Sequence, residues 1–234
     1  MSYHVPVLLK ECIEGLAIKA DGIYVDVTFG GGGHASEILK HLTTGHLYAF
    51  DQDADAVKNA ERFQGMPFTF IEANFRYIKR YLKMHGVSKV DGILADFGIS
   101  SHQINEATRG FSTRFDSMLD MRMDQSLKKN AMDVLNTYSE AELHKIFGMY
   151  GEVKNAKTLA GHVISARINK KIETVEDFKK ILKPLAPRNA ENKYYAQVFQ
   201  AIRIDVNEEI KVIQEFLPQA SELLEKDGRL VVIS

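Results

Sequence analysis

The sequence predicts an α/β fold, in which a parallel β-sheet is covered by helices and interrupted by an all-helical insertion. Three observations support this prediction: strand and helix patterns alternate through residues 22–96, four glycines follow the first strand pattern, and no convincing strand pattern is found between residues 101 and 192. Alternation of strands and helices is typical of a parallel sheet, because parallel neighbours need a crossover connection that a helix usually provides.

Apolar runs in the first hundred residues predict four strands, at residues 22–29, 46–51, 68–73 and 90–96. Between them, apolar residues spaced three and four apart predict helices at residues 34–42, 54–63 and 75–85. Asn74 stands just before the third helix, where its side chain can accept a hydrogen bond from an unpaired backbone N–H group.

Helix-start sequences then mark the insertion. SEAE at residues 139–142 and TVED at residues 174–177 each place a hydroxyl three residues before a carboxylate, and residues 155–168 also show helical spacing. After the insertion, apolar residues predict a long helix bent at Pro218, a turn at Asp227–Gly228, and a fifth strand; the helical pattern runs through Val206, Ile210, Ile213 and Leu217. We expect a discontinuous core domain of residues 1–100 and 206–234, and a helical domain of residues 101–205.

The composition is that of an ordinary globular protein, with 45% hydrophobic and 26% charged residues and a net charge of −1. No apolar run is long enough to cross a membrane, no signal peptide is recognisable, and the scattered His residues and the single cysteine, Cys12, have no metal-ligand spacing. We expect a reduced, cytoplasmic protein without a metal. Positive charge is concentrated in residues 100–205, which carry 17 Lys and Arg against 13 Asp and Glu.

The glycine run lies between the first strand and the first helix, where doubly wound sheets bind ligands. Gly30, Gly32 and Ala35 fit the G-x-G-x-x-A pattern of dinucleotide sites, although such runs also occur in plain loops. Asp51 ends the second strand, where a carboxylate can accept hydrogen bonds from both ribose hydroxyls of an adenosine. The alternative for Asp51 is a helix cap at the start of DQDAD.

Two cofactors fit such a site, NAD and S-adenosylmethionine. NAD brings an anionic pyrophosphate to the glycine turn, so nearby carboxylates would repel it. S-adenosylmethionine carries a cationic sulfonium and an ammonium group, which carboxylates attract. Asp26 lies four residues before the first glycine, and Asp96 ends the fourth strand. These two acids favour S-adenosylmethionine.

Several motifs resemble, in order, the signatures of the MraW/RsmH-type bacterial ribosomal RNA methyltransferases. They are YHVPVLLKE, TFGGGGHASEIL, AFDQDADA, LADFGISSHQI, RGFSTRFDSMLDMRMD and FQAIRIDVNEEI. The resemblance implies a class I (Rossmann-like) S-adenosylmethionine-dependent methyltransferase core with an inserted all-helical domain that recognises RNA. It also implies N4-methylation of a cytidine in the decoding region of small-subunit ribosomal RNA, within an assembled or assembling small subunit.

The same resemblance implies a set of cofactor residues. Asp51 would bind the ribose and Phe75 would line the adenine pocket; the remaining members are Gly32, Gly33, His34, Asp96 and Gln103. Each also has a simpler explanation. Phe75 would serve as a core anchor, His34 as a surface residue of the first helical turn, and Gln103 as a solvated loop side chain.

The implied chemistry needs a hydrogen-bond acceptor for the cytidine amine, which is a poor nucleophile because its lone pair is delocalised into the ring. Asp96 is the best candidate for this catalytic role, with binding of the cofactor's methionine end as the alternative. Its surroundings read DFGISS, which differs from the Asp-Pro-Pro-Tyr sequence of many DNA amino-methyltransferases.

RNA contacts are expected in the basic insertion. Arg109 and Arg114 alternate with Phe111 and Phe115, a mixture that can contact phosphates and stack on bases. Further candidates are Arg122 and a second cluster comprising Arg188, Lys193, Tyr194, Tyr195 and Arg203. The alternative is structural: Arg122 can pair with Asp120 and Asp124, and Phe111 can belong to the core.

Members of the resembled family continue beyond the strand that ends this sequence, so the sequence predicts five strands where a class I core normally has seven. Besides RNA methyl transfer, two other functions stay open. One is a catalytically weak RNA-binding or assembly module, and the other is an NAD-dependent oxidoreductase supported by the G-x-G-x-x-A match alone.

Overall fold

The computed structural model describes residues 6–234, so the first residues of the YHVPVLLKE motif, 3–5, lie outside the described residues. The chain forms two compact units. The sheet unit contains the residues up to Ser100 together with Lys211–Ser234, and the helical unit contains Ser101–Ile210. The second boundary thus falls at residues 210/211, against the expected 205/206. No helix in the described part of the chain is both long and apolar enough to span a membrane.

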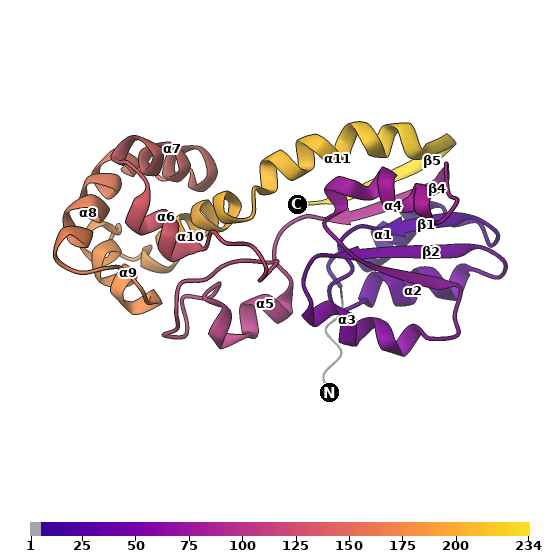
Figure 1. Cartoon of the computed structure of the whole chain (residues 1–234), viewed down its shortest axis with the longest axis horizontal. Coiled ribbons are helices and arrows are strands. Elements are labelled where there is room, and N and C mark those ends of the chain that lie inside the picture. The colour runs from indigo at the N-terminus through magenta and orange to yellow at the C-terminus, as the bar shows by residue number, and fades with distance from the viewer. Residues whose placement is uncertain (1–5) are drawn as a thin grey trace. The chain divides into compact units, whose positions relative to one another are not determined.

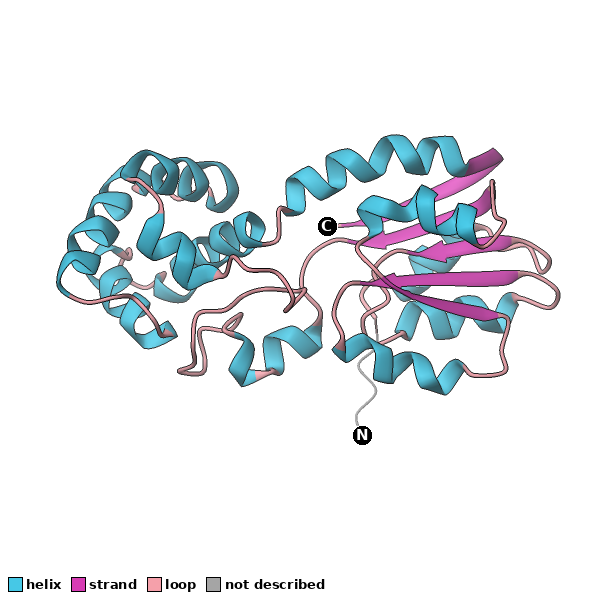
Figure 2. Cartoon of the chain, in the orientation of Figure 1, coloured by secondary structure: helices cyan, strands magenta, loops and turns pink. Residues whose placement is uncertain are grey.

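The sheet unit contains five parallel strands in the order β3-β2-β1-β4-β5 (Figures 1 and 2). Their bounds are β1 Ile23–Asp26, β2 His46–Asp51, β3 Phe68–Glu72, β4 Val90–Asp96 and β5 Leu224–Ile233. The chain proceeds outward from β1 to β3 and then returns to place β4 on the other side of β1. This change of direction creates a switch point at the carboxyl ends of β1 and β4, where doubly wound sheets bind ligands.

Helices cover both faces of the sheet, because successive strand residues point to opposite sides. In β1, Tyr24 packs with residues of α1 Leu9–Leu16, α2 Gly33–His41 and α3 Asp55–Ala60. Val25 packs on the other face with residues of α4 Ile78–Met84 and α11 Glu209–Leu223. The expected α/β fold is therefore confirmed.

Two predicted helices begin or end with a 3₁₀ turn. The helix predicted at residues 54–63 consists of α3 followed by η1 Glu61–Phe63, and the one predicted at 75–85 consists of η2 Phe75–Tyr77 followed by α4. Asn74 Oδ1 accepts a hydrogen bond from the Arg76 N–H at 2.9 Å, so the predicted cap is present.

The helix predicted through Val206 and Leu217 is interrupted. α10 ends at Val206, Glu208 adopts a left-handed φ of 50°, and α11 starts again at Glu209 with Pro218 inside it. Ile210 and Leu217 are exposed, whereas the buried face of α11 carries Val212, Phe216, Ala220 and Leu223. A helix over Ile210–Leu217 is confirmed, but the predicted continuity with Val206 and the predicted buried face are wrong, because a single helical period does not continue through the break at Glu208.

The turn predicted at Asp227–Gly228 is instead an irregularity inside the last strand, which begins earlier, at Leu224. Asp227 has a φ of 66°, and the pairing with β4 shifts register between Val90, which pairs with Leu224, and Gly92, which pairs with Arg229. Regular pairing then continues to Asp96 and Ile233.

The helical unit packs its helices around apolar side chains. Its elements are α5 Ser101–Asn105, η3 Ala107–Arg109, α6 Ala131–Thr137, α7 Glu140–Gly151, α8 Ala156–Asn169, α9 Val175–Leu182, η4 Lys183–Leu185 and α10 Glu191–Val206. Ser139 and Glu142 form a reciprocal capping box, and Thr174 accepts a hydrogen bond from the Asp177 N–H. Within the fully described range 101–192, the only strand-like pairing is an isolated bridge between Met118 and Thr174.

Candidate cofactor site and nucleic-acid interface

Three carboxylates gather at the carboxyl ends of adjacent strands. Asp26 ends β1, Asp51 ends β2 and Asp96 ends β4, and β1 lies between the other two strands. The three are close enough that the charges of Asp51 and Asp96 both raise the pKa of Asp26. This edge of the sheet unit is therefore a concentrated region of negative charge.

Asp26 is the most deeply buried of the three, with 1% of its surface exposed. Its Oδ1 accepts a hydrogen bond from the Thr28 N–H at 3.1 Å, while its Oδ2 is buried without a hydrogen-bond partner in the described chain. Burial raises the pKa of Asp26 to about 7. A buried oxygen without a partner is costly, so this carboxylate is suited to a ligand that brings positive charge or a hydrogen-bond donor.

Asp51 organises the glycine loop. Its Oδ2 accepts a hydrogen bond from the Gly30 N–H at 2.7 Å, and its Oδ1 accepts one from the Asp53 N–H at 2.9 Å. Burial raises the pKa of Asp51 to about 6, although these hydrogen bonds favour its charged form. An ionised carboxylate has about four acceptor positions, so each oxygen keeps capacity for a further donor such as a ribose hydroxyl.

The glycine loop needs glycine for its own geometry. Gly32 has a φ of 69°, and a Cβ there would approach the Phe29 ring to 2.8 Å. A Cβ on Gly33 would lie 2.3 Å from Pro6. The glycine pattern thus has a structural cause at these two positions, in addition to any role in bringing the backbone close to a ligand.

His34 lies in the first turn of α2 and is buried, with 7% exposed, so it is not the surface residue of the simpler explanation. Its Nε2 lies 3.1 Å from the carbonyl oxygen of Val7. Burial lowers the pKa of His34, opposed by the hydrogen bond to Val7 and by the charge of Asp96.

Asp96 is held in place through its backbone. Its N–H donates to Thr28 Oγ1 at 2.7 Å, so Thr28 bonds to both Asp26 and Asp96. Burial raises the pKa of the half-buried Asp96, and the nearby His34 lowers it. Sequence reasoning missed Thr28, whose only signal was its position between the strand and the glycines.

Phe75 packs against the core and keeps part of its surface exposed. The ring follows β3 and lies 5.6 Å from the Phe97 ring and 5.2 Å from the Phe216 ring, between centroids. Gln103 lies on α5 of the helical unit with 6% exposed, which is inconsistent with a solvated loop side chain.

Arg109, predicted to contact RNA, is a buried structural residue. Its guanidinium donates from Nη2 to the carbonyl oxygens of Arg122 at 2.8 Å and of Met123 at 3.1 Å, and only 6% of the residue is exposed. It also lies 5.7 Å from the ring of Phe111, which is buried as the structural alternative required. Because the Arg109 side chain is buried, it is not the open phosphate-binding side chain that we expected.

Arg122 and Arg203 are also engaged within the helical unit. Arg122 binds both carboxylate oxygens of Asp120, from Nε at 2.6 Å and from Nη2 at 2.7 Å. Arg203 binds both oxygens of Glu209, at 2.8 and 3.1 Å. Such bidentate pairs occupy the donors that a phosphate would need.

Arg114 differs from these three arginines, because its side chain is exposed and forms no hydrogen bond or ion pair with the described residues. The neighbouring Phe115 is 41% exposed. In the second predicted cluster, Arg188 and Lys193 are exposed, whereas Tyr194 and Tyr195 are buried and unavailable for stacking on a base.

Asn207 is a buried structural residue that the sequence did not single out. Its Oδ1 accepts from the Met123 N–H at 2.7 Å, and its Nδ2 donates to the carbonyl oxygens of Met121 at 2.8 Å and Arg203 at 2.9 Å. Together, Arg109 and Asn207 fix the loop of residues 119–124. No group of three His, Cys, Asp or Glu residues among positions 6–234 has the arrangement of a metal site.

Comparisons with known proteins identify the family of the chain. The profile of the MraW methylase family matches residues 1–234. A protein of Cytophaga hutchinsonii named ribosomal RNA small subunit methyltransferase H is 61% identical over 99% of this chain and 78% of its own length. Proteins of the same name from Christiangramia forsetii and Flavobacterium johnsoniae are 57% and 53% identical, each over 100% of this chain and 77% of its own length. The chain therefore belongs to the MraW methylase family.

Proposed function

We propose that this chain transfers a methyl group from S-adenosylmethionine to N4 of a cytidine in the decoding region of small-subunit ribosomal RNA, in the cytoplasm. Membership of a methylase family and the names of the relatives support the reaction and the class of RNA. The observation that carries the choice of donor is the buried, unpartnered Oδ2 of Asp26 between two further carboxylates.

The residues at the strand ends fit this cofactor by their charge. S-adenosylmethionine supplies an activated methyl group on a cationic sulfur, and the same molecule carries an ammonium group. Asp26 and Asp96 are suited to positive charge, because burial makes an uncompensated carboxylate unfavourable. A pyrophosphate at this edge would add negative charge to three carboxylates, which disfavours a nicotinamide dinucleotide.

The other cofactor residues take roles that match their positions. Asp51, which keeps acceptor capacity on both oxygens, would bind the ribose diol. Phe75 would present its exposed part to the adenine, with Gly32, Gly33 and His34 shaping the turn near the methionine part. Gln103 is proposed as a further cofactor residue.

Asp96 is proposed as the catalytic residue. A cytidine amine must turn its lone pair out of conjugation as it attacks the methyl carbon, and an acceptor for one of its N–H groups favours that pyramidal geometry. The Asp96 carboxylate has no hydrogen-bond partner within the described chain, so it is available to accept one. The Asp96 carboxylate would then orient the amine and stabilise the positive charge that develops on its nitrogen.

RNA recognition is proposed for the helical unit, with Arg114 and Phe115 as the exposed contact pair. The exocyclic amine of a paired, stacked cytidine cannot reach a methyl donor, so the base must be single-stranded or flipped out. An exposed arginine beside an exposed aromatic ring can bind the backbone and stack on a base.

The decisive test is methyl transfer. We would incubate the chain with tritium-labelled S-adenosylmethionine and unmodified small ribosomal subunits, and then identify the labelled nucleoside. Labelled N4-methylcytidine is expected. Binding of RNA without transfer would support the assembly-module alternative. Calorimetric titration with S-adenosylhomocysteine and NADH separates the two cofactor classes, since only the first is expected to bind.

A further inference from the structure

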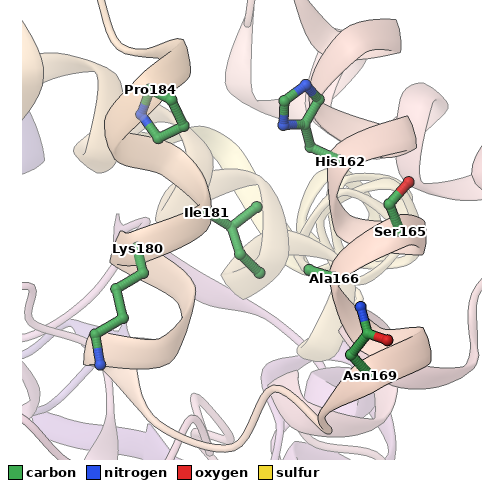
Figure 3. Close-up of a pocket in the computed structure, with 7 residues that line it drawn as sticks. All are labelled: His162, Ser165, Ala166, Asn169, Lys180, Ile181 and Pro184. Atoms are coloured by element: carbon green, nitrogen blue, oxygen red, sulfur yellow. The ribbon is translucent and has the colours of Figure 1, made fainter.

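A surface groove lies between α8 and α9 of the helical unit, apart from the residues discussed above (Figure 3). Its volume is about 410 Å³, within the range of about 300–1,000 Å³ that small-molecule sites occupy. The lining residues are His162, Ser165, Ala166 and Asn169 from α8, with Lys180, Ile181 and Pro184 from the facing segment. Ile181 and Ala166 lie between the two helices, so the middle of the groove is apolar, and its borders are polar except at Pro184.

The segment that builds the groove is strongly basic. Residues 156–190 contain eight Lys and Arg against three Asp and Glu. Two of the three acids are already paired, Asp177 with Lys170 at 2.7 Å and Glu176 with Lys179 at 3.3 Å. No acidic residue lines the groove.

Several cations of this segment remain unpaired, among them Lys180, which lines the groove. They are exposed and form no hydrogen bond or ion pair with any described residue: Lys157, Lys171, Lys180, Lys183 and Arg188. By contrast, residues 131–155, which form α6 and α7, contain two Lys against four Asp and Glu. Positive charge is thus concentrated in residues 156–190, which build the groove, rather than in residues 131–155. A basic segment of this kind is complementary to an anionic partner.

We infer that this groove binds a single-stranded stretch of the RNA substrate, as a second contact besides Arg114. Phosphates would lie against Lys180 and Lys183, and a base or ribose would pack on Ile181 and Ala166. Asn169 can donate to and accept from the edge of a base, and Ser165, whose hydroxyl donates to the Gly161 carbonyl oxygen at 2.9 Å, can accept from it. A groove with an apolar middle and hydrogen-bonding borders is suited to an unstacked nucleotide rather than to a smooth double helix. The inference rests on the proposed function, because it takes RNA as the substrate.

The first experiment reverses charge beside the groove. In the full chain, the double variant Lys180→Glu/Lys183→Glu is compared with Lys83→Glu/Lys145→Glu, which changes the net charge equally at exposed positions on α4 and α7. The probe is a fluorescent single-stranded RNA with the decoding-region sequence, titrated at several salt concentrations. We expect the groove variant to bind at least tenfold more weakly, and the control variant to stay within about threefold of the parent. Each lost phosphate contact should lower the salt slope by about 0.7.

The second experiment fills the groove without changing charge. Ser165→Trp should weaken RNA binding severalfold while leaving the salt slope unchanged, because it blocks a base and keeps every lysine. Equal losses in the groove and control double variants would overturn the inference, and so would full RNA affinity in Ser165→Trp. Displacement of bound RNA by polyglutamate as effectively as by unlabelled oligocytidine would also overturn it, in favour of an acidic protein partner.

The outcome can be separated from that of the proposed function. Binding of S-adenosylhomocysteine is measured for every variant and should not change, because no altered residue lies among the proposed cofactor residues. If methyl transfer to small subunits persists while the groove variants bind RNA normally, only the groove inference fails. If the groove variants lose RNA affinity but the parent chain never transfers a methyl group, only the proposed function fails.

Discussion

The carboxylates of the sheet unit and the arginines of the helical unit are both buried or half-buried charges, yet their surroundings differ. Asp26 has one hydrogen bond to Oδ1 and none to Oδ2. Arg109 donates to two carbonyl oxygens and lies over an aromatic ring. A buried charge that the chain already satisfies stabilises the fold, whereas one left incomplete leaves room for a ligand. Whether the chain supplies all hydrogen-bond partners of a buried charge therefore distinguishes ligand-binding candidates from structural residues more clearly than residue type does.

The strongest test of the comparison is Arg109→Met, which keeps the apolar stem but removes the guanidinium. The carbonyl oxygens of Arg122 and Met123 would lose their partner, and each unsatisfied buried acceptor costs roughly 1–3 kcal/mol. We therefore expect unfolding free energy of the helical unit to fall by roughly 2–5 kcal/mol, measured by urea denaturation. Arg114→Met should change it by less than about 0.5 kcal/mol, as at other exposed sites. Equal effects at both positions would contradict the structural role of Arg109.

The second prediction concerns the incomplete carboxylate, Asp26. Because its pKa is raised to about 7 in the folded protein, the folded state holds a proton that the unfolded state releases near pH 4. The contribution of Asp26 to stability without ligand should therefore be fully present below about pH 4, and a few kcal/mol of it should be lost as the pH rises to 7. Asp51, with a pKa of about 6, contributes to the same trend.

Asp26→Asn should remove much of this pH dependence, because the side chain can no longer ionise. The measurement is the urea midpoint at half-unit intervals between pH 4 and 8, with Asp21→Asn, an exposed position, as the control. The same variant should bind S-adenosylmethionine at least tenfold more weakly. A variant that keeps the parent's pH slope would show that Asp26 is not the group that titrates.

Sequence patterns predicted much of the sheet unit, because its strands depend on local apolar runs. The strands at residues 46–51 and 90–96 were located without error, and the acids at their ends follow from those bounds. The loop of residues 119–124 could not be predicted in this way. Its supports, Arg109 and Asn207, bond to residues more than ten and more than eighty positions away, and no local pattern shows which donors will meet.

The third prediction tests whether the free carboxylate at the end of β4 acts in catalysis. Asp96→Asn keeps the shape and the backbone hydrogen bond to Thr28 but weakens acceptance from the amine. We expect kcat for methyl transfer to fall more than tenfold, about 1.4 kcal/mol or more in activation free energy. Thermal unfolding should be unchanged, and S-adenosylhomocysteine should still bind. A fall in cofactor affinity with kcat preserved would instead assign Asp96 to the methionine end.

The smallest expected effect belongs to Arg114, an exposed arginine that forms no hydrogen bond or ion pair with the described residues. Arg114→Ala should weaken RNA binding by about threefold to tenfold and lower the salt slope by about 0.7, the contribution of one single-strand phosphate contact. The matched control is Arg122→Ala, whose guanidinium is already held by Asp120. It should lower stability and leave the salt slope of the remaining folded protein unchanged. If Arg122→Ala lowered the slope as much as Arg114→Ala, an internally paired arginine would be contacting phosphate, and pairing would no longer distinguish structural from RNA-binding arginines in this chain.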